Sequence, residues 1–371
     1  MSRPSQAGSA KRRRLVVPVL AAGVAALIAG AWAGLARFGM SVGSPPAALH
    51  GPLMVLGFLG TVIAVERAVA LGRPWAWAAP LVSAAAVVML LLGAEGAGSA
   101  TLTVAAVALC AAYLAGIRIS GPEPHLLVMG LGAVSWLVAA AGITVSTPVP
   151  EVVPALAGFL VLTIAGERLE LSRMAPPRPA WWLPAVLGAS LAMALAAVIG
   201  SLAMSPASSI GGFAMVVLAV TLAFGDVARR TIRRPGVTRF MAVALLVGYA
   251  WLALAGILWV GGRLAPGPIT YDAALHAVFV GFVLSMVFAH APVIVPAVAR
   301  IELPFHAVWW APLVLLHASL ALRIGGAFGD SYFARSWGGT LNVVALGGFL
   351  VVVAGSAVAA RVGRSGGAHG P

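Results

Sequence analysis

Residues 48–71 of the chain read ALHGPLMVLGFLGTVIAVERAVAL. Between His50 and Glu66 this stretch carries no charged side chain. A helix that crosses a bilayer needs about 20 consecutive, mostly apolar residues, and the stretch is long enough. Because lipid offers no hydrogen-bond partners, a segment of this length has to satisfy its backbone groups internally, as an α-helix. The stretch therefore predicts a membrane-spanning helix with polar residues near both ends.

The same pattern recurs along the chain. Of its 371 residues, 61% are hydrophobic and 9% are charged, whereas soluble domains carry about 25% charged residues. Twelve stretches have spanning length, at residues 15–36, 48–71, 75–94, 99–119, 124–146, 152–171, 181–201, 207–228, 238–260, 272–292, 306–324 and 337–360. The sequence therefore predicts an all-α, polytopic membrane protein. We expect one twelve-helix transmembrane domain over residues 15–361, with a basic cytoplasmic tail over 1–14 and a second cytoplasmic tail over 362–371.

The basic residues support this topology. With the N-terminus inside, nineteen of the 23 Lys and Arg residues fall in cytoplasmic segments, as the positive-inside rule requires. The four outer ones are Arg37, Arg263, Arg323 and Arg335. We expect a protein of the cell (inner) membrane, surrounded by the lipid bilayer, with both termini cytoplasmic. The net charge of +13 does not indicate nucleic acid binding, because the charges lie between apolar segments.

An internal repeat organises the spans. Three parts of residues 57–67 (Gly-Phe-Leu, Ile-Ala and Glu-Arg) recur at the same spacing within residues 158–168. A looser copy begins with Gly-Phe-Val at residue 281. The copies lie four helices apart, so the pattern predicts three pseudo-repeated arcs of four helices.

Two histidines are the main functional candidates. His50 opens the second span and His276 lies just inside the tenth, each roughly 5 Å below the outer boundary at 1.5 Å per residue. Imidazole inside a bilayer is costly and indicates a functional site by default. Two histidines at equal depth could hold one planar cofactor from both faces, which favours b-type haem with two axial histidines. The alternative is two interfacial histidines bonded to water or backbone carbonyls.

Haem at that depth would need cations for its outward propionates. Arg37, Arg263 and Arg323 are the candidates, and Arg323 is the best placed because it directly follows an apolar stretch. The alternative for each arginine is snorkelling to the interface. Asp272, four residues before His276, either orients the imidazole or caps the helix, and a cap is the simpler expectation.

Further polar residues form a secondary set. His317 lies near the middle of the eleventh span, where it either bonds to another helix or serves as a ligand or proton relay. His290, Glu66, Glu167 and Asp226 lie near the inner ends of their spans. We expect them to form ion pairs with Arg67 and Arg168, or else a proton or quinol site. The pairs His50–Met54 and Met286–His290 share helix faces and could bind copper, although packing explains the methionines equally simply.

These features resemble a known group of proteins. Twelve helices in three arcs, with histidines near the outer ends of the second and tenth, are similar to the main subunit of haem–copper oxidases and to the related NnrS-type membrane proteins. The stretch His50-Gly51-Pro52-Leu53-Met54 resembles the His-Gly-x-x-Met start of the oxidases' second helix. The resemblance implies that His50 and His276 are the axial ligands of a low-spin haem. The spacing of His50 to Gly57-Phe58 resembles the NnrS-type pattern, and that family is regarded as containing haem and copper and as linked to nitric oxide stress.

The chain also departs from the oxidases. The sixth and seventh spans contain no histidine, and Ala274 and Val278 occupy the positions two residues either side of His276. The copper ligands of an oxygen-reducing centre are therefore missing, and we do not predict an oxygen or nitric oxide reductase. We expect a membrane haem protein for electron transfer, or for nitric oxide- or oxygen-linked respiration or stress response, with a redox partner or respiratory subunit. The alternatives are a cofactor-free transporter or permease and a copper-handling membrane protein.

Overall fold

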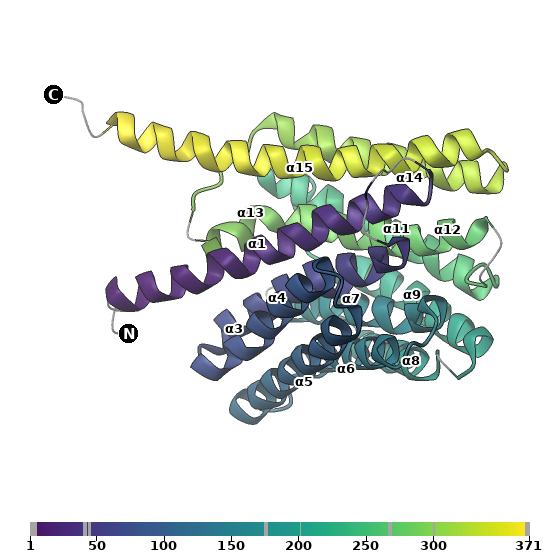
Figure 1. Cartoon of the computed structure of the whole chain (residues 1–371). Helices are drawn as coiled ribbons and strands as arrows, with labels where there is room; N and C mark the ends of the chain where they lie inside the picture. Colours follow the sequence, from purple (N-terminus) through teal and green to yellow (C-terminus); the bar gives the residue numbers. More distant parts are fainter. Residues whose placement is uncertain are drawn as a thin grey trace. The chain divides into compact units, whose positions relative to one another are not determined.

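The structure is a computed structural model that describes residues 6–39, 43, 46–173, 177–200, 202–265, 269–299 and 301–367 (Figure 1). Within these residues, twelve helical segments are long and apolar enough to cross a membrane. They are Val16–Ala36, Ala47–Leu71, Pro74–Leu91, Glu95–Ser120, Pro124–Thr144, Val149–Ser172, Trp182–Ile199, Met204–Gly225, Val237–Val260, Thr270–Ala297, Ala307–Phe328 and Tyr332–Arg361. The predicted all-α, twelve-span fold is confirmed, and the chain is a multi-pass membrane protein.

The chain divides into two compact units. The first comprises Met1–Gly166 and Ala196–Ala203. Its elements are α1 (Gln6–Ala36), η1 (Ala47–Leu49), α2 (His50–Pro52), η2 (Leu53–Leu59), α3 (Gly60–Leu71), η3 (Pro74–Trp77), α4 (Ala78–Leu91), α5 (Glu95–Ser120), α6 (Pro124–Thr144) and most of α7 (Val149–Ser172). Helix α5 packs between α4 and α6, and α1 packs on η2 and α4.

The second unit comprises Glu167–Leu195 and Met204–Pro371. It holds the end of α7, most of α8 (Trp182–Ile199), α9 (Met204–Gly225), α10 (Ala228–Thr231), α11 (Val237–Val260), α12 (Thr270–His276), η4 (Ala277–Leu284), α13 (Ser285–Ala299), η5 (Ala307–Trp309), α14 (Trp310–Phe328) and α15 (Tyr332–Gly367). Helices α14 and α15 lie side by side as a hairpin (Figure 1), and α11 packs against α9, η4 and α13. The grouping of the twelve spans into three four-helix arcs stays a prediction.

Some helix ends differ from those predicted. The tenth span was predicted to end at residue 292, but α13 continues to Ala299 through Pro292 and Pro296. A proline removes one backbone donor and can kink a helix without ending it. The described part of the predicted basic tail, residues 6–14, belongs to α1, and α15 extends past residue 361 to Gly367.

The second and tenth spans share an irregularity that the sequence did not predict. Each contains a π-helical segment, η2 over Leu53–Leu59 and η4 over Ala277–Leu284. At the end of η2 the Gly60 N–H bonds to the Val55 carbonyl, five residues back instead of four. π-Helical turns are rare and occur often at functional sites. Here each one begins within three residues of a candidate histidine.

Candidate functional site

His50 is the first residue of α2, and its side chain packs against α1. Its Nδ1 lies 2.7 Å from the backbone carbonyl oxygen of Gly30. A carbonyl oxygen only accepts hydrogen bonds, so Nδ1 carries the ring hydrogen of the neutral imidazole. The ring lone pair is then on Nε2, the nitrogen that points away from this bond.

A pair of glycines makes room for this contact. In the stretch Gly30-Ala-Trp-Ala-Gly34 the two glycines lie on one face of α1, a spacing that lets membrane helices approach closely. A Cβ atom at Gly34 would lie 2.8 Å from the His50 ring, and one at Gly30 would lie 2.9 Å from Met54 Cγ. The His50 ring and the Met54 side chain therefore occupy a notch in α1 that only glycine leaves open. The sulfur of Met54 is packed against Gly30, which is the packing role that the sequence allowed for it.

His276 ends α12 and is held by Asp272. Its Nδ1 lies 2.8 Å from the Asp272 carbonyl oxygen and 3.2 Å from the Asp272 carboxylate. Nδ1 of His276 therefore also carries the hydrogen, and the lone pair is again on Nε2. The carboxylate in turn accepts two hydrogen bonds from Arg323, from Nε at 2.7 Å and from Nη2 at 2.6 Å. The three side chains form a chain from Arg323 through Asp272 to His276.

The structure corrects the expected role of Asp272. It was expected to cap the helix, but the N-cap of α12 is Ile269 and no side chain caps it. Arg323 does not snorkel to the interface, because it is buried and paired with Asp272. The other outer arginines are exposed or partly exposed: Arg37 donates to the Ala47 carbonyl at 3.0 Å, and Arg263 lies in the turn after α11.

His317 has a different partner and the opposite tautomer. Trp251 on α11 donates from Nε1 to Nδ1 of His317 on α14, at 3.0 Å. The expected bond to another helix is confirmed. Because Nδ1 accepts, the hydrogen of a neutral His317 ring lies on Nε2, which is buried and has no hydrogen-bond partner among the residues that the structure describes. His317 thus lacks the Nε2 lone pair that His50 and His276 share.

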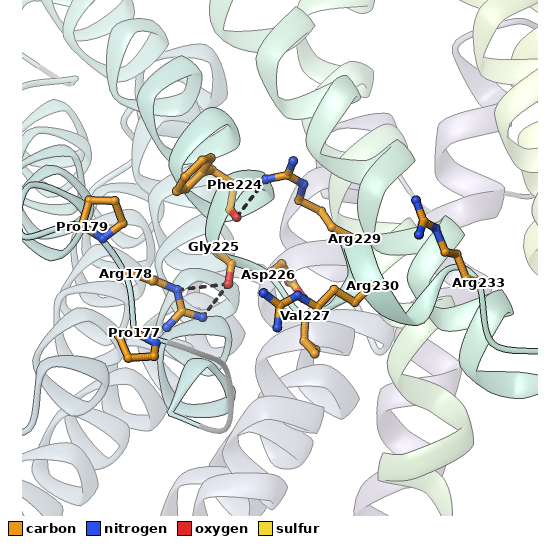
Figure 2. Close-up of a pocket in the computed structure, with 10 residues that line it drawn as sticks. All are labelled: Pro177, Arg178, Pro179, Phe224, Gly225, Asp226, Val227, Arg229, Arg230 and Arg233. Carbon is orange, nitrogen blue, oxygen red and sulfur yellow. Dashed lines mark hydrogen bonds between the residues drawn. The ribbon is translucent and has the colours of Figure 1, made fainter.

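A pocket of about 460 Å³ lies where α9 ends (Figure 2). Its walls come from the segment before α8, from the end of α9 and from the residues around α10. The lining residues are Pro177, Arg178, Pro179, Phe224, Gly225, Asp226, Val227, Arg229, Arg230 and Arg233. The sequence indicated these arginines only as part of the cytoplasmic charge and did not predict a pocket.

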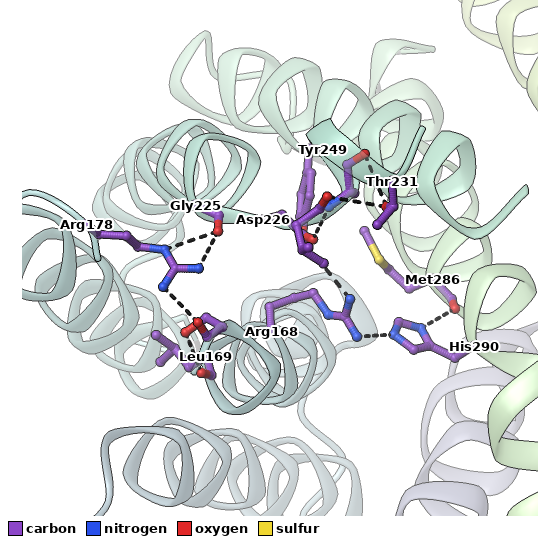
Figure 3. A network of polar contacts seen from close by, with 12 residues as sticks. Arg168, Leu169, Arg178, Gly225, Asp226, Thr231, Tyr249, Met286 and His290 are labelled. Carbon is purple, nitrogen blue, oxygen red and sulfur yellow. Dashed lines mark hydrogen bonds and ion pairs between the residues drawn. The ribbon is translucent and has the colours of Figure 1, made fainter. Parts of the chain in front are cut away.

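Asp226 of this pocket also belongs to a polar network (Figure 3). Arg168 at the end of α7 donates to Nε2 of His290 on α13, and its Nη1 lies 3.8 Å from the Asp226 carboxylate. His290 donates from Nδ1 to the Met286 carbonyl, and Tyr249 on α11 donates its hydroxyl to Asp226 at 2.6 Å. The predicted ion pair between Arg168 and Asp226 is confirmed. Tyr249 was not predicted, because a single tyrosine in an apolar helix gives no sign of its partner.

The remaining side chains of the secondary set make other contacts. Arg67 is placed over the Tyr113 ring, 4.9 Å from its centroid, and Glu66 and Glu167 each have contacts of their own. The Met286 side chain is buried against Gly248. Among the described residues, no group of three or more His, Cys, Asp and Glu side chains could hold a metal ion. Copper binding by the methionine–histidine pairs stays a prediction.

Comparison of the sequence with known protein families identifies one family that it matches. The sequence pattern of a family described as a domain of unknown function (DUF8744) matches residues 14–358, which is nearly the whole chain. No curated protein matches the chain.

Proposed function

The chain belongs to this family of unknown function, DUF8744, and we propose that it binds b-type haem in the membrane with His50 and His276 as iron ligands. The observation that carries the proposal is the contact that each imidazole makes from Nδ1 to a backbone carbonyl oxygen, at 2.7 Å for His50 and 2.8 Å for His276. Each donates its Nδ1 hydrogen to a backbone carbonyl and keeps its lone pair on Nε2. Histidines that bind metals almost always donate their other ring N–H to a carbonyl, carboxylate or water in this way.

The surroundings of each histidine support the same assignment. The His50 ring is oriented by the Gly34 notch, and the His276 ring by the Asp272 carboxylate. Fixed orientation of the ring is what a ligand to a rigid macrocycle requires. A π-helical segment begins within three residues of each histidine, although the two lie far apart in the sequence.

Haem bound in this way would supply one-electron redox chemistry. Two imidazoles on one iron leave no open coordination position, which favours electron transfer over gas binding. In this proposal Asp272 orients His276 and makes it a stronger electron donor, while Arg323 balances the negative charge of Asp272. With Arg323 engaged there, Arg37 and Arg263 are the first candidates to pair with the propionates.

The wider setting follows from the sequence. The excess of basic residues on one side supports a location in the cell (inner) membrane with both termini cytoplasmic. The resemblance to NnrS-type proteins and oxidase main subunits supports a role in electron transfer, or in respiration or stress responses linked to nitric oxide or oxygen. A redox partner or respiratory subunit would then exchange electrons with the haem.

An optical spectrum with a pyridine haemochrome assay tests the proposal. The purified protein, expressed with haem supplied, should show the sharp reduced bands of a six-coordinate b haem, at about one haem per chain. His50→Ala and His276→Ala should each remove the haem, whereas His306→Ala should not, because His306 is an exposed residue before η5. Two haems per chain would overturn the pairing of the histidines. A colourless protein would overturn haem binding and leave a cofactor-free transporter as the better account.

A further inference from the structure

The pocket at the end of α9 carries strong positive charge. Four of its ten lining residues are arginines, namely Arg178, Arg229, Arg230 and Arg233. Asp226 is the single carboxylate among the lining residues that the structure describes. A concave surface lined by charges of one sign concentrates the electrostatic field and attracts ions of the opposite sign.

Asp226 offsets only part of this charge, because its carboxylate is also engaged by residues that do not line the pocket. Its carboxylate accepts the Tyr249 hydroxyl at 2.6 Å and the Ala228 backbone N–H at 2.9 Å. Arg168, at 3.8 Å, is a buried cation that balances the Asp226 charge from the protein side. The four arginines of the pocket are therefore left with a net positive charge.

Two of these arginines are held in place by the backbone. Arg178 donates to the carbonyls of Gly225 and Ser172 and lies over the Trp182 ring, 4.4 Å from its centroid. Arg229 reaches the Phe224 carbonyl at 3.3 Å (Figure 2). Burial lowers the pKa of Arg178, and the nearby charge of Asp226 acts in the opposite direction. A guanidinium has five N–H groups, so each of these arginines keeps donors for a bound oxyanion.

The pocket lies at the level of a membrane boundary. It is built from the last two residues of the span Met204–Gly225 and from residues that follow it or precede the spans Trp182–Ile199 and Val237–Val260. Exposed Trp181 contacts exposed Phe224, with ring centroids 5.7 Å apart. Aromatic side chains are typical of the layer where lipid headgroups meet the acyl chains.

An apolar strip on α9 leads away from the pocket. Phe213, Val220 and Phe224 are all exposed and share one face of the helix. In a membrane this face contacts lipid tails. The charged pocket and the apolar strip therefore adjoin each other, as the phosphate and the acyl chains of a lipid do.

From these observations we propose that the pocket binds a phosphate group. Guanidinium groups donate parallel hydrogen bonds to phosphate oxygens, and arginine clusters are a common means of phosphate recognition. The phosphate would belong to the headgroup of an anionic lipid or to a soluble phosphate compound. The pocket volume is in the range of small-ligand sites. This site is separate from the proposed haem ligands and stands without them.

Native mass spectrometry of the detergent-solubilised full chain tests the site. The probes are phosphatidylglycerol, phosphatidylcholine and sn-glycerol 3-phosphate, each added to delipidated protein at low salt. The variant Arg230→Gln/Arg233→Gln removes two exposed charges of the pocket. Its matched control is Arg73→Gln/Arg118→Gln, which removes two exposed arginines in the first unit. Both doubles have the same net charge, so a general loss of positive charge cannot explain a difference between them.

We expect phosphatidylglycerol to bind the unaltered chain and the control equally. It should bind the pocket variant about 30-fold more weakly, because each of the two missing arginines typically strengthens binding to an anionic headgroup about fivefold. If glycerol 3-phosphate binds with the same dependence on Arg230 and Arg233, the ligand is a soluble phosphate. If only phosphatidylglycerol binds with this dependence on Arg230 and Arg233, the ligand is a lipid headgroup. Equal binding of every probe to the pocket variant and the control would overturn the proposal, and so would phosphatidylcholine binding as tightly as phosphatidylglycerol with no soluble phosphate bound.

Discussion

Arg323 donates two hydrogen bonds to the carboxylate of Asp272, at 2.7 and 2.6 Å. The two residues lie on different helices, α14 and α12, and both side chains are largely removed from solvent. Asp272 lies one helical turn before His276 and contacts its Nδ1 through both the backbone carbonyl and the carboxylate. The ion pair therefore determines where the imidazole points as well as how the two helices meet.

Asp272→Asn tests the link between this ion pair and the proposed ligand. The substitution keeps the shape of the side chain and removes its charge, so His276 loses its carboxylate partner and keeps only the backbone carbonyl of residue 272. Haem affinity should fall about 10- to 100-fold, as measured by haem titration of the apo-protein. Asp330→Asn is the control, since Asp330 is exposed in the turn before α15. Equal haem affinity in both variants would separate Asp272 from ligand positioning.

Arg323→Gln tests the ion pair itself and does not depend on haem. It leaves the Asp272 carboxylate largely buried without its cation. Loss of one partner of a buried pair typically costs about 3 to 5 kcal/mol, and because Asp272 is partly exposed we expect the low end of that range. The thermal unfolding midpoint in detergent, followed by circular dichroism, should fall clearly. The double variant with Asp272→Asn should recover part of the loss, and a failure to recover would show that Arg323 stabilises the fold in another way.

Gly34→Ala tests the notch in α1. The added Cβ would lie 2.8 Å from the His50 ring, closer than such contacts occur, so the ring has to move. Overpacking of this kind costs about 1 to 3 kcal/mol, and the proposed haem should be lost or its spectrum changed. Gly23→Ala on the same helix is the control, because its nearest neighbours are 3.8 Å away. If the two variants have identical spectra, the notch does not position a ligand.

The twelve-span fold could be predicted from the sequence, for a physical reason. Spanning length and the exclusion of charge are local properties that any window of sequence displays, so all twelve spans were found. The partners of the polar residues were harder to predict because they depend on which helices meet. Asp272 was expected to cap its own helix because that interaction is local, whereas its real partner, Arg323, lies 51 residues away.

Other features were not predicted for the same reason, namely that they depend on which helices pack together. Tyr249 and Asp226 are 23 residues apart and meet only because α9 and α11 pack together. The π-helical segments reflect packing along the whole span and have no fixed sequence signal. Gly30 and Gly34 were not predicted to matter: their spacing of four residues is a small-residue motif, and only the structure connects it to His50.

Trp251→Phe should distinguish His317 from the proposed ligands. The substitution removes the indole N–H that His317 accepts at 3.0 Å but keeps most of the ring volume. Loss of one partly buried hydrogen bond, with the acceptor left unpaired, should cost about 1 to 3 kcal/mol, seen as a lower unfolding midpoint. The haem spectrum and stoichiometry should stay unchanged, because His317 has the tautomer opposite to that of His50 and His276. A change in the spectrum would bring His317 into the cofactor site.

Two substitutions in the polar network around Asp226 should lower the stability of the fold by different amounts. Tyr249→Phe removes one hydrogen bond to the Asp226 carboxylate and should cost about 1.5 to 3 kcal/mol. Arg168→Gln removes the cation from a pair whose side chains are 7% and 5% exposed, and it also removes the donor to His290. That change should cost about 3 to 5 kcal/mol, because Asp226 would keep its charge with no buried cation beside it. Adding Asp226→Asn to Arg168→Gln removes the unbalanced charge and should raise the unfolding midpoint again, whereas adding Asp226→Asn to Tyr249→Phe should not. The reverse order of the two single variants would mean that the hydrogen bond from Tyr249, and not the ion pair with Arg168, stabilises Asp226 at the end of α9.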